Sequence, residues 1–251
     1  MIDNDFADEW DHSSDDFELG ADEAHLWRAS LNQEAHTIAN LAALLSQDEY
    51  SKAMRYYRPA DRDRYIAGRG ILRKILSAYL ALPPSELRFT YNEYGRPALS
   101  DDQNDRALNF NLSHSGALAL YAVTRGRTVG IDIEQIREDF ATLEIAEHFF
   151  SKDEVEALKS LPEGQRTAGF FNCWSRKEAF IKAKGMGVSY PLDRFTVSLA
   201  PDDPPALLKV DDDELEATQW RLYELKPGAG YAAALIAAAP PITLKRRHWV
   251  E

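Results

Sequence analysis

A helix followed by a short strand occurs twice along the chain, and this repetition sets the strongest limit on its architecture. Arg73-Lys74 lies in one predicted helix and Arg176-Lys177 lies in another. The sequence Arg-Phe-Thr follows each helix, at 88–90 and at 194–196, and each half then ends in an apolar strand. The repetition predicts two similar α/β halves with a ligand cleft between them. The alternative is a chance match of short strings.

Capping residues and apolar periodicity locate the individual elements. Ser46 and Glu49 have the spacing of a capping box, as do Ser151 and Glu154, so a helix is expected to begin after each serine. Prolines and glycines mark the helix ends. The predicted helices run from 47 to 58, from 61 to the prolines at 83–84, from 152 to 161 and from 167 to 184. The predicted strands are 87–91, 118–123, 128–134, 195–199, 219–225 and 231–239, and 201–216 is predicted to be a loop.

Charge is distributed unevenly over the 251 residues, whose formal net charge is −12. Residues 1–23 contain ten acidic residues and no Lys or Arg, which predicts a disordered acidic tail. We expect an N-terminal half at 24–127, a C-terminal half at 128–251 and an active site in the cleft between them. Residues 52–74 are basic, which indicates a local anionic partner unless they are only the solvated faces of two helices.

Several classes of protein do not agree with the composition. Cys173 is the only cysteine, so an intramolecular disulfide is impossible and a cysteine-built zinc site is not expected. The acidic N-terminus is unlike a secretory signal, and no apolar run approaches the roughly 20 residues that a membrane helix needs. We expect a cytoplasmic, monomeric protein that binds neither membranes nor nucleic acid.

The most informative segment is Val129-Gly130-Ile131-Asp132-Ile133-Glu134. Side chains alternate between the faces of a strand, so Asp132 and Glu134 share the face opposite to the aliphatic residues. Neighbouring carboxylates repel each other unless a cation joins them, and oxygen ligands suit magnesium or manganese. The segment therefore predicts a metal site, and the alternative is a strand with one solvated face.

A second group of residues recurs on one face of a predicted helix. Trp174, Glu178 and Lys182 are spaced four apart. They form either a surface ion pair beside a tryptophan or a site in which Glu178 is a third metal ligand and Lys182 binds phosphate. Ser113 and His114 are predicted to lie in a polar turn before an apolar strand, where such residues usually satisfy backbone groups.

Together these segments resemble the Sfp-type 4′-phosphopantetheinyl transferases. The matching segments occur in the family's order over about 46–240. They are Asn92–Pro97, Phe110–Gly116, Val129–Glu134, Phe149–Glu154, and Trp174–Lys182 with Gly185 and Gly187. The family fold implied by this resemblance is α/β (α+β). It has two similar halves related by a pseudo-two-fold axis, each a small, mainly antiparallel sheet packed with helices.

The resemblance also implies a reaction. The enzyme would transfer the 4′-phosphopantetheine arm of coenzyme A to a serine of an apo acyl or peptidyl carrier protein and release 3′,5′-ADP. By motif match, Asp132, Glu134 and Glu178 would hold magnesium, or manganese, on the pyrophosphate of coenzyme A. Lys182 would contact the phosphates.

A further set of residues is expected to bind the nucleotide part of coenzyme A. By the same resemblance they are Ser113 and His114 at phosphate groups, Arg96 and Pro97 at the adenine nucleotide pocket, and Lys52 and Arg64 near the 3′-phosphate. Two positions depart from the family pattern. Arg96 stands where some members have lysine, and Glu49 stands where some have a basic residue.

The expected catalytic residues are Glu154, Glu178 and Lys182. Glu154 matches a family carboxylate assigned near the step in which the serine hydroxyl loses its proton, for which Lys182 or a metal-bound water are rivals. Its capping-box position after Ser151 is an equally complete structural explanation. Two other functions stay open. One is a magnesium-dependent nucleotide hydrolase, and the other is a non-catalytic module that binds acidic carrier proteins through residues 52–74.

Overall fold

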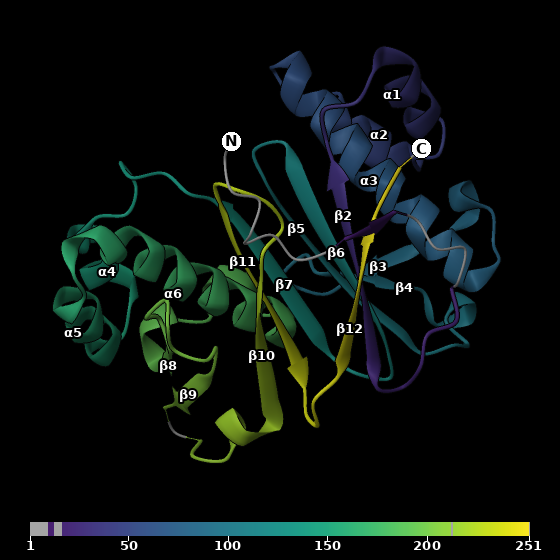
Figure 1. Cartoon of the computed structure of the whole chain (residues 1–251). Helices are drawn as coiled ribbons and strands as arrows, with labels where there is room; N and C mark the ends of the chain where they lie inside the picture. The colour runs from purple at the N-terminus through teal and green to yellow at the C-terminus, as the bar shows by residue number, and fades with distance from the viewer. Residues whose placement is uncertain (1–9, 13–16, 212, 251) are drawn as a thin grey trace.

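Two larger β-sheets lie at the centre of the computed structural model, which describes residues 10–12, 17–211 and 213–250. The first sheet has the strand order β1-β12-β2-β6-β5, and the second has the order β10-β11-β7 (Figure 1). The strands of the first sheet are β1 (Asp11–His12), β2 (Glu23–Ser30), β5 (Leu108–Ser115), β6 (Leu118–Arg125) and β12 (Thr243–His248). Those of the second are β7 (Val129–Gln135), β10 (Trp220–Leu225) and β11 (Tyr231–Ala238). Two hairpins pair β3 (Phe89–Tyr91) with β4 (Pro97–Leu99) and β8 (Phe195–Val197) with β9 (Leu207–Val210).

The helices form two groups, one beside each sheet (Figure 1). The first group is α1 (Ala35–Ala42), α2 (Gln47–Ala53) and α3 (Pro59–Leu80). The second group is α4 (Leu143–Phe149), α5 (Lys152–Ser160) and α6 (Glu163–Lys184). Short 3-10 helices lie at Pro84–Glu86, Asp101–Gln103, Gly187–Ser189, Leu192–Arg194 and Glu216–Gln219. None of the helices in the described part of the chain is both long enough and apolar enough to cross a bilayer.

Separate hydrophobic clusters join these layers. One cluster fills the space between α3 and the first sheet, and another lies between α6 and the second sheet. A third joins the two sheets and contains Val129, Ile131 and Ile133 of β7. The opposite face of β7 lies against α6, and the contact depends on Gly130, because an added Cβ there would lie 2.1 Å from the carbonyl oxygen of Ala179. The helix therefore covers the face of β7 that carries the acidic residues, and it leaves Asp132 buried and Glu134 half-buried.

The predicted fold class is confirmed, because the chain forms small, mainly antiparallel sheets packed with helices. Both predicted capping boxes are present, at Ser46 and at Ser151. The helix predicted at 47–58 is shorter than expected, since it ends at Ala53, and the next helix begins at Pro59, where proline is suited to the first turn. The loop predicted at 201–216 contains β9.

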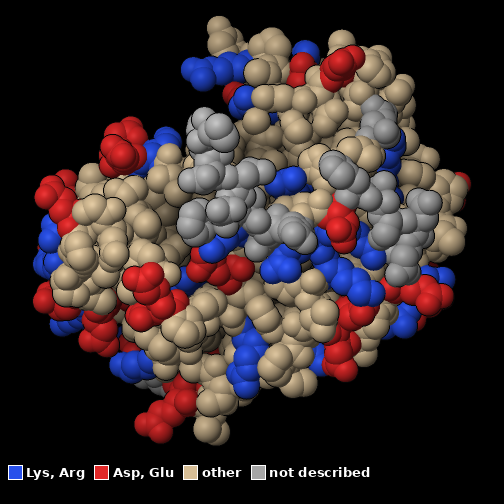
Figure 2. All heavy atoms as spheres, viewed as in Figure 1, with Lys and Arg blue, Asp and Glu red and all other residues tan. Residues whose placement is uncertain are grey.

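The last strand corrects the predicted C-terminal half at 128–251. β12 lies in the first sheet, in parallel register with β2, so the end of the chain returns to the N-terminal half. Lys and Arg side chains gather over this strand in the middle of the face shown in Figure 2. Its sequence contains Lys245, Arg246 and Arg247.

The predicted disordered tail at 1–23 is wrong for the part that the structure describes. Asp11 and His12 pair with β12, and Trp10 and Leu19 are buried. These apolar side chains offset the entropy of ordering the segment, which its charge alone did not indicate. Residues 1–9 and 13–16 lie outside the described residues.

Candidate active site

Polar side chains from β5, β7 and α6 meet at one point. Asp132 of β7 is 2 % exposed, and its Oδ1 accepts hydrogen bonds from Lys182 Nζ at 2.6 Å and Ser113 Oγ at 2.8 Å. Lys182 Nζ also donates to Ser113 Oγ at 2.8 Å. Three residues from separate predicted motifs therefore contact one another directly.

The second carboxylate oxygen of Asp132 is the most informative atom in this group. Oδ2 is buried and has no hydrogen-bond partner among the described residues. A buried acceptor without a donor carries an uncompensated desolvation cost. The site therefore has an unmet preference for a donor or a cation near Oδ2.

Glu134 and Glu178 belong to the same electrostatic neighbourhood. Burial, followed by the negative charge of Asp132, raises the pKa of Glu134, although Ser115 Oγ donates to its carboxylate at 3.0 Å. Burial and then the charge of Asp132 raise the pKa of Glu178 to about 7, with Lys182 acting in the opposite direction. The charge of Asp132 thus disfavours ionisation of both glutamates, and a divalent cation among them would relieve this repulsion.

Metal binding by all three carboxylates stays a prediction. Within the described residues, no group of three or more His, Cys, Asp or Glu side chains is arranged so that it could hold a metal ion as it stands. The ammonium group of Lys182 meets the charge of Asp132 instead. The donor chemistry is that of a magnesium site, since all the candidate ligands are carboxylate oxygens.

A cavity of about 580 Å³ lies between α2, α3 and the β3–β4 hairpin. Lys52 and Pro97 line it, as predicted for a nucleotide pocket, together with Arg88 and Tyr91. Lys52 Nζ lies 5.6 Å from the centre of the Tyr65 ring. The cavity thus offers aromatic surface beside positive charge.

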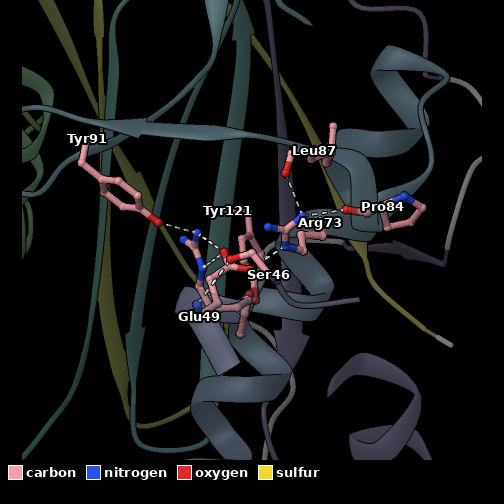
Figure 3. A network of polar contacts seen from close by, with 9 residues as sticks. Ser46, Glu49, Arg73, Pro84, Leu87, Tyr91 and Tyr121 are labelled. Atoms are coloured by element: carbon pink, nitrogen blue, oxygen red, sulfur yellow. Dashed lines mark hydrogen bonds and ion pairs between the residues drawn. The ribbon is translucent and has the colours of Figure 1, made fainter. Parts of the chain in front are cut away.

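A buried ion network forms one wall of this cavity (Figure 3). Glu49 is 4 % exposed, and its two oxygens accept from Arg69 Nε at 2.8 Å and Arg73 Nε at 2.7 Å. It also accepts from the backbone N–H of Ser46, which completes the capping box. Arg69 Nη2 reaches the hydroxyl of Tyr91 at 3.1 Å. The acidic residue that departs from the family pattern is therefore neutralised by two arginines.

His114 lies within electrostatic reach of both Lys182 and Arg64. Both Ser113 and His114 belong to β5, which corrects the predicted turn. Desolvation, and then the positive charges of Lys182 and Arg64, lower the pKa of His114, although the residue as a whole is exposed. Arg64 Nε donates to Asn32 Oδ1 at 3.1 Å and does not line the cavity.

Arg96 does not line the cavity either, in contrast to its neighbour Pro97. Its Nη1 donates to the carbonyl oxygen of Ala183 at 2.6 Å, and its Nη2 donates to that of Val129 at 3.1 Å. Burial lowers the pKa of Arg96. The guanidinium is directed toward α6 and β7, away from the predicted adenine pocket.

Glu154 has a complete set of structural partners. It is 1 % exposed, accepts from the backbone N–H groups of Ser151 and Val197, both at 2.7 Å, and forms an ion pair with Lys177 at 2.7 Å. None of these contacts with described residues involves Lys182 or Asp132. The capping box explains the contact with Ser151, and Val197 and Lys177 hold the carboxylate from other elements, so the structure does not bring Glu154 into the group around Asp132.

Sequence reasoning missed two residues that support this group. Asn111 Oδ1 accepts from the backbone N–H of Ile131 at 2.8 Å, and Ser115 contacts Glu134. Asn111, Ser113 and Ser115 alternate along β5 and therefore share one face. A period of two in this segment was the signal that could have identified them.

Comparisons with known proteins give the same family for both parts of the chain. Residues 128–236 match the model of the 4′-phosphopantetheinyl transferase superfamily, and residues 26–125 match a model described as 4′-phosphopantetheinyl transferase, N-terminal. The sequence is 42 % identical over 220 residues to the 4′-phosphopantetheinyl transferase HetI of Nostoc sp., covering 88 % of this chain and 90 % of that protein. It is 35 % identical over 198 residues to the 4′-phosphopantetheinyl transferase Sfp of Bacillus subtilis, covering 79 % of this chain and 84 % of that protein. The crystal structure of Thermotoga maritima holo-[acyl-carrier-protein] synthase aligns with a TM-score of 0.36 and 20 % identity over 46 % of this chain and 64 % of that chain.

Proposed function

The chain belongs to the 4′-phosphopantetheinyl transferase superfamily, and on that basis we propose the following reaction. The enzyme transfers the 4′-phosphopantetheine arm of coenzyme A to a serine of an apo acyl or peptidyl carrier protein, with magnesium, and releases 3′,5′-ADP. The serine oxygen bonds to the phosphorus that carries pantetheine, the bond from that phosphorus to the bridging oxygen breaks, and the serine proton passes to a base.

The observation that carries this proposal is the contact of Lys182 with Asp132 and Ser113. A flexible cation beside a buried carboxylate and a hydroxyl is suited to a diphosphate, because the ammonium group can exchange one of its contacts for a phosphate oxygen. Negative charge grows on the leaving 3′,5′-ADP during transfer, and Lys182 stabilises it. Ser113 and His114 bind the phosphate groups from the same strand.

Magnesium, or manganese, fits the acidic residues of this site. Asp132, Glu134 and Glu178 would hold the ion. The support is the buried Oδ2 of Asp132 and the raised pKa values of the two glutamates. A bound divalent ion would supply charge neutralisation of the pyrophosphate. The proposal of a metal site thus depends on the chemical type of these ligands and not on a coordination geometry that is already formed.

The cavity between α2, α3 and the β3–β4 hairpin accepts the nucleotide part of coenzyme A. Its volume of about 580 Å³ suits an adenosine phosphate, and Lys52 supplies positive charge for the 3′-phosphate. Pro97 and Tyr91 offer surfaces for the base. Arg69 and Arg73 are largely neutralised by Glu49, and Arg88 pairs with Asp102, so Lys52 is the main source of available positive charge among the described residues of this wall.

Glu178 is better suited than Glu154 to accept the proton of the serine hydroxyl, provided that it is not a ligand of the ion at that step. It belongs to the Asp132 neighbourhood, where burial and the charge of Asp132 raise its pKa to about 7. A base with a pKa near the working pH is the most effective, whereas a divalent ion bound by Glu178 would lower this pKa. Glu154 is instead held by Lys177 and by two backbone N–H groups.

The test is the mass of a carrier protein after incubation with coenzyme A, magnesium and the enzyme. We expect the carrier to gain one phosphopantetheine group, and the gain should disappear when magnesium is chelated. No gain over a panel of acyl and peptidyl carriers would refute the proposal. Release of 3′,5′-ADP from coenzyme A without any carrier would favour the hydrolase instead.

Two lysines of α6 provide a matched pair of variants. Lys182→Ala should lower kcat/KM by roughly 10²- to 10³-fold, as expected for loss of a transition-state charge partner. Lys184 lies one half-turn away and pairs with Glu216, so Lys184→Ala should keep the activity of the natural protein. Equal losses in the two variants would contradict the role of Lys182.

A further inference from the structure

The turn between β3 and β4 contacts the end of α6. Arg96 donates to the carbonyl oxygen of Ala183 at 2.6 Å, in the last turn of the helix, and to that of Val129 at 3.1 Å, where β7 begins. Asn92 Nδ2 donates to the carbonyl oxygen of Gly185 at 2.7 Å. The last carbonyls of a helix lack partners within the helix, and here a turn from the other half of the chain provides donors.

The turn itself is held in shape by its own polar groups. Asn92 Oδ1 accepts from the backbone N–H groups of Tyr94 at 3.1 Å and Arg96 at 2.8 Å. The Asn92 N–H donates to the Arg96 carbonyl oxygen at 3.1 Å, and Gly95 has a φ of 80°. These hydrogen bonds hold the turn at 92–96 in one conformation, and this fixes the position from which the Arg96 side chain extends.

The helix end fits closely against this turn. Gly185 has a φ of 70°, and an added Cβ there would lie 3.2 Å from Arg96 Cδ and 3.3 Å from Asn92 Nδ2. The helix terminates in the left-handed conformation that glycine favours, directly under the turn. Movement of the last turn of α6 would break these contacts.

We propose that Arg96 is a positioning residue that holds Lys182 against Asp132. The carbonyl of Ala183 directly follows Lys182 in the chain, and that of Val129 lies on the strand that carries Asp132. A single guanidinium fixes the last turn of α6 relative to β7, because its planar fork donates to both elements at once. This inference rests on the proposed function, since it concerns the geometry needed for transfer, and it differs from a direct contact of Arg96 with the nucleotide.

A double-mutant cycle between Arg96 and Lys182 tests the inference. Arg96→Ala should lower kcat for transfer by about 10- to 100-fold, the cost of a misplaced catalytic group, and should change the KM for coenzyme A by less than about 3-fold. In the Lys182→Ala background, Arg96→Ala should cost less than about 3-fold, because two residues that act through one contact are not additive. Equal costs in both backgrounds would overturn the proposal, as would a rise in KM with kcat unchanged.

Two further variants separate positioning from general stability. Arg221 is exposed and also donates to backbone carbonyls, but these belong to its own segment, at Thr218 and Trp220. Arg221→Ala should leave transfer unchanged. Arg96→Lys keeps the charge and loses the fork, so it should restore only part of kcat. It also serves in the same cycle if Arg96→Ala does not fold. Full restoration by lysine would contradict a role for the fork.

Hydrogen exchange tests the same inference without any activity. Amides in the last turn of α6, residues 181–185, should exchange faster in Arg96→Ala than in the natural protein, whereas amides of α3 should be unchanged. Unchanged exchange at 181–185 would overturn the proposal even if the enzyme transferred nothing. If the natural protein transfers nothing but Arg96→Ala still speeds exchange at 181–185, the proposed function is refuted. The structural role of Arg96 in holding α6 against β7 is then retained.

Discussion

The buried network around Glu49 makes a strong prediction about stability. Glu49→Gln keeps the shape of the side chain but leaves Arg69 and Arg73 without their counter-charge. Their side chains are 10 % and 1 % exposed. Removing one partner of a buried ion pair costs about 3–5 kcal/mol. For a chain of this size each kcal/mol lowers Tm by about 2–4 °C, so we expect a decrease of roughly 6–20 °C.

The assay is thermal and urea unfolding followed by circular dichroism, with an exposed pair as the matched control. Arg88 and Asp102 also form an ion pair, but their side chains are 62 % and 63 % exposed. Asp102→Asn should change the free energy of unfolding by less than about 1 kcal/mol. If Glu49→Gln lowers the free energy of unfolding by no more than Asp102→Asn does, the reasoning from burial is refuted.

The same variant has an expected pH dependence. Burial raises the pKa of Glu49, but the charges of Arg69 and Arg73 outweigh it and the pKa lies below its ordinary value of 4.5. A carboxyl with a lowered pKa contributes stability that is fully present above the unfolded value and is lost as pH falls through the folded value. The difference between the natural protein and Glu49→Gln should therefore shrink below pH 4.5. A difference that grows on acidification would refute this reasoning.

Other variants test the remaining roles. Asp132→Ala should abolish carrier modification, measured by mass spectrometry, while circular dichroism shows a folded protein; retained transfer at saturating magnesium would contradict the ligand assignment. Glu154→Gln should cost about 3–5 kcal/mol in urea unfolding because buried Lys177 loses its partner, while kcat per folded molecule changes by less than about 3-fold. A 10²-fold or greater loss of kcat in folded Glu154→Gln would restore Glu154 as the base. Gly130→Ala should lower both Tm and kcat, because the new Cβ would lie 2.1 Å from the Ala179 carbonyl oxygen and must move α6; an unchanged Tm would contradict the close contact.

Local signals in the sequence predicted the elements around the site well. The capping boxes at Ser46 and Ser151 require only residues three apart, and both are present. The period of two in β7 correctly separated Ile131 and Ile133, which pack between the sheets, from Asp132 on the other face. These features could be predicted because each is recognised from residues that are close together in the sequence.

Contacts between distant segments were not predictable in the same way. Nothing local indicates that Arg96 reaches Ala183 and Val129, because its partners are backbone carbonyls that every residue carries. The position of Ser113 in a strand depends on pairing with β6, which the polar sequence around it obscured. The resemblance named candidate residues for the site, whereas only the structure shows which of them contact one another.

The position of β12 has a consequence for synthesis of the chain on the ribosome. This strand covers β2, so one side of β2 stays unpaired until β12 has emerged. At about 5–20 residues per second, the ribosome needs roughly 6–24 s to translate from the end of β6 to β12. During that interval the nascent N-terminal half presents an open strand edge to other chains, and this risk of aggregation lasts until β12 pairs with β2.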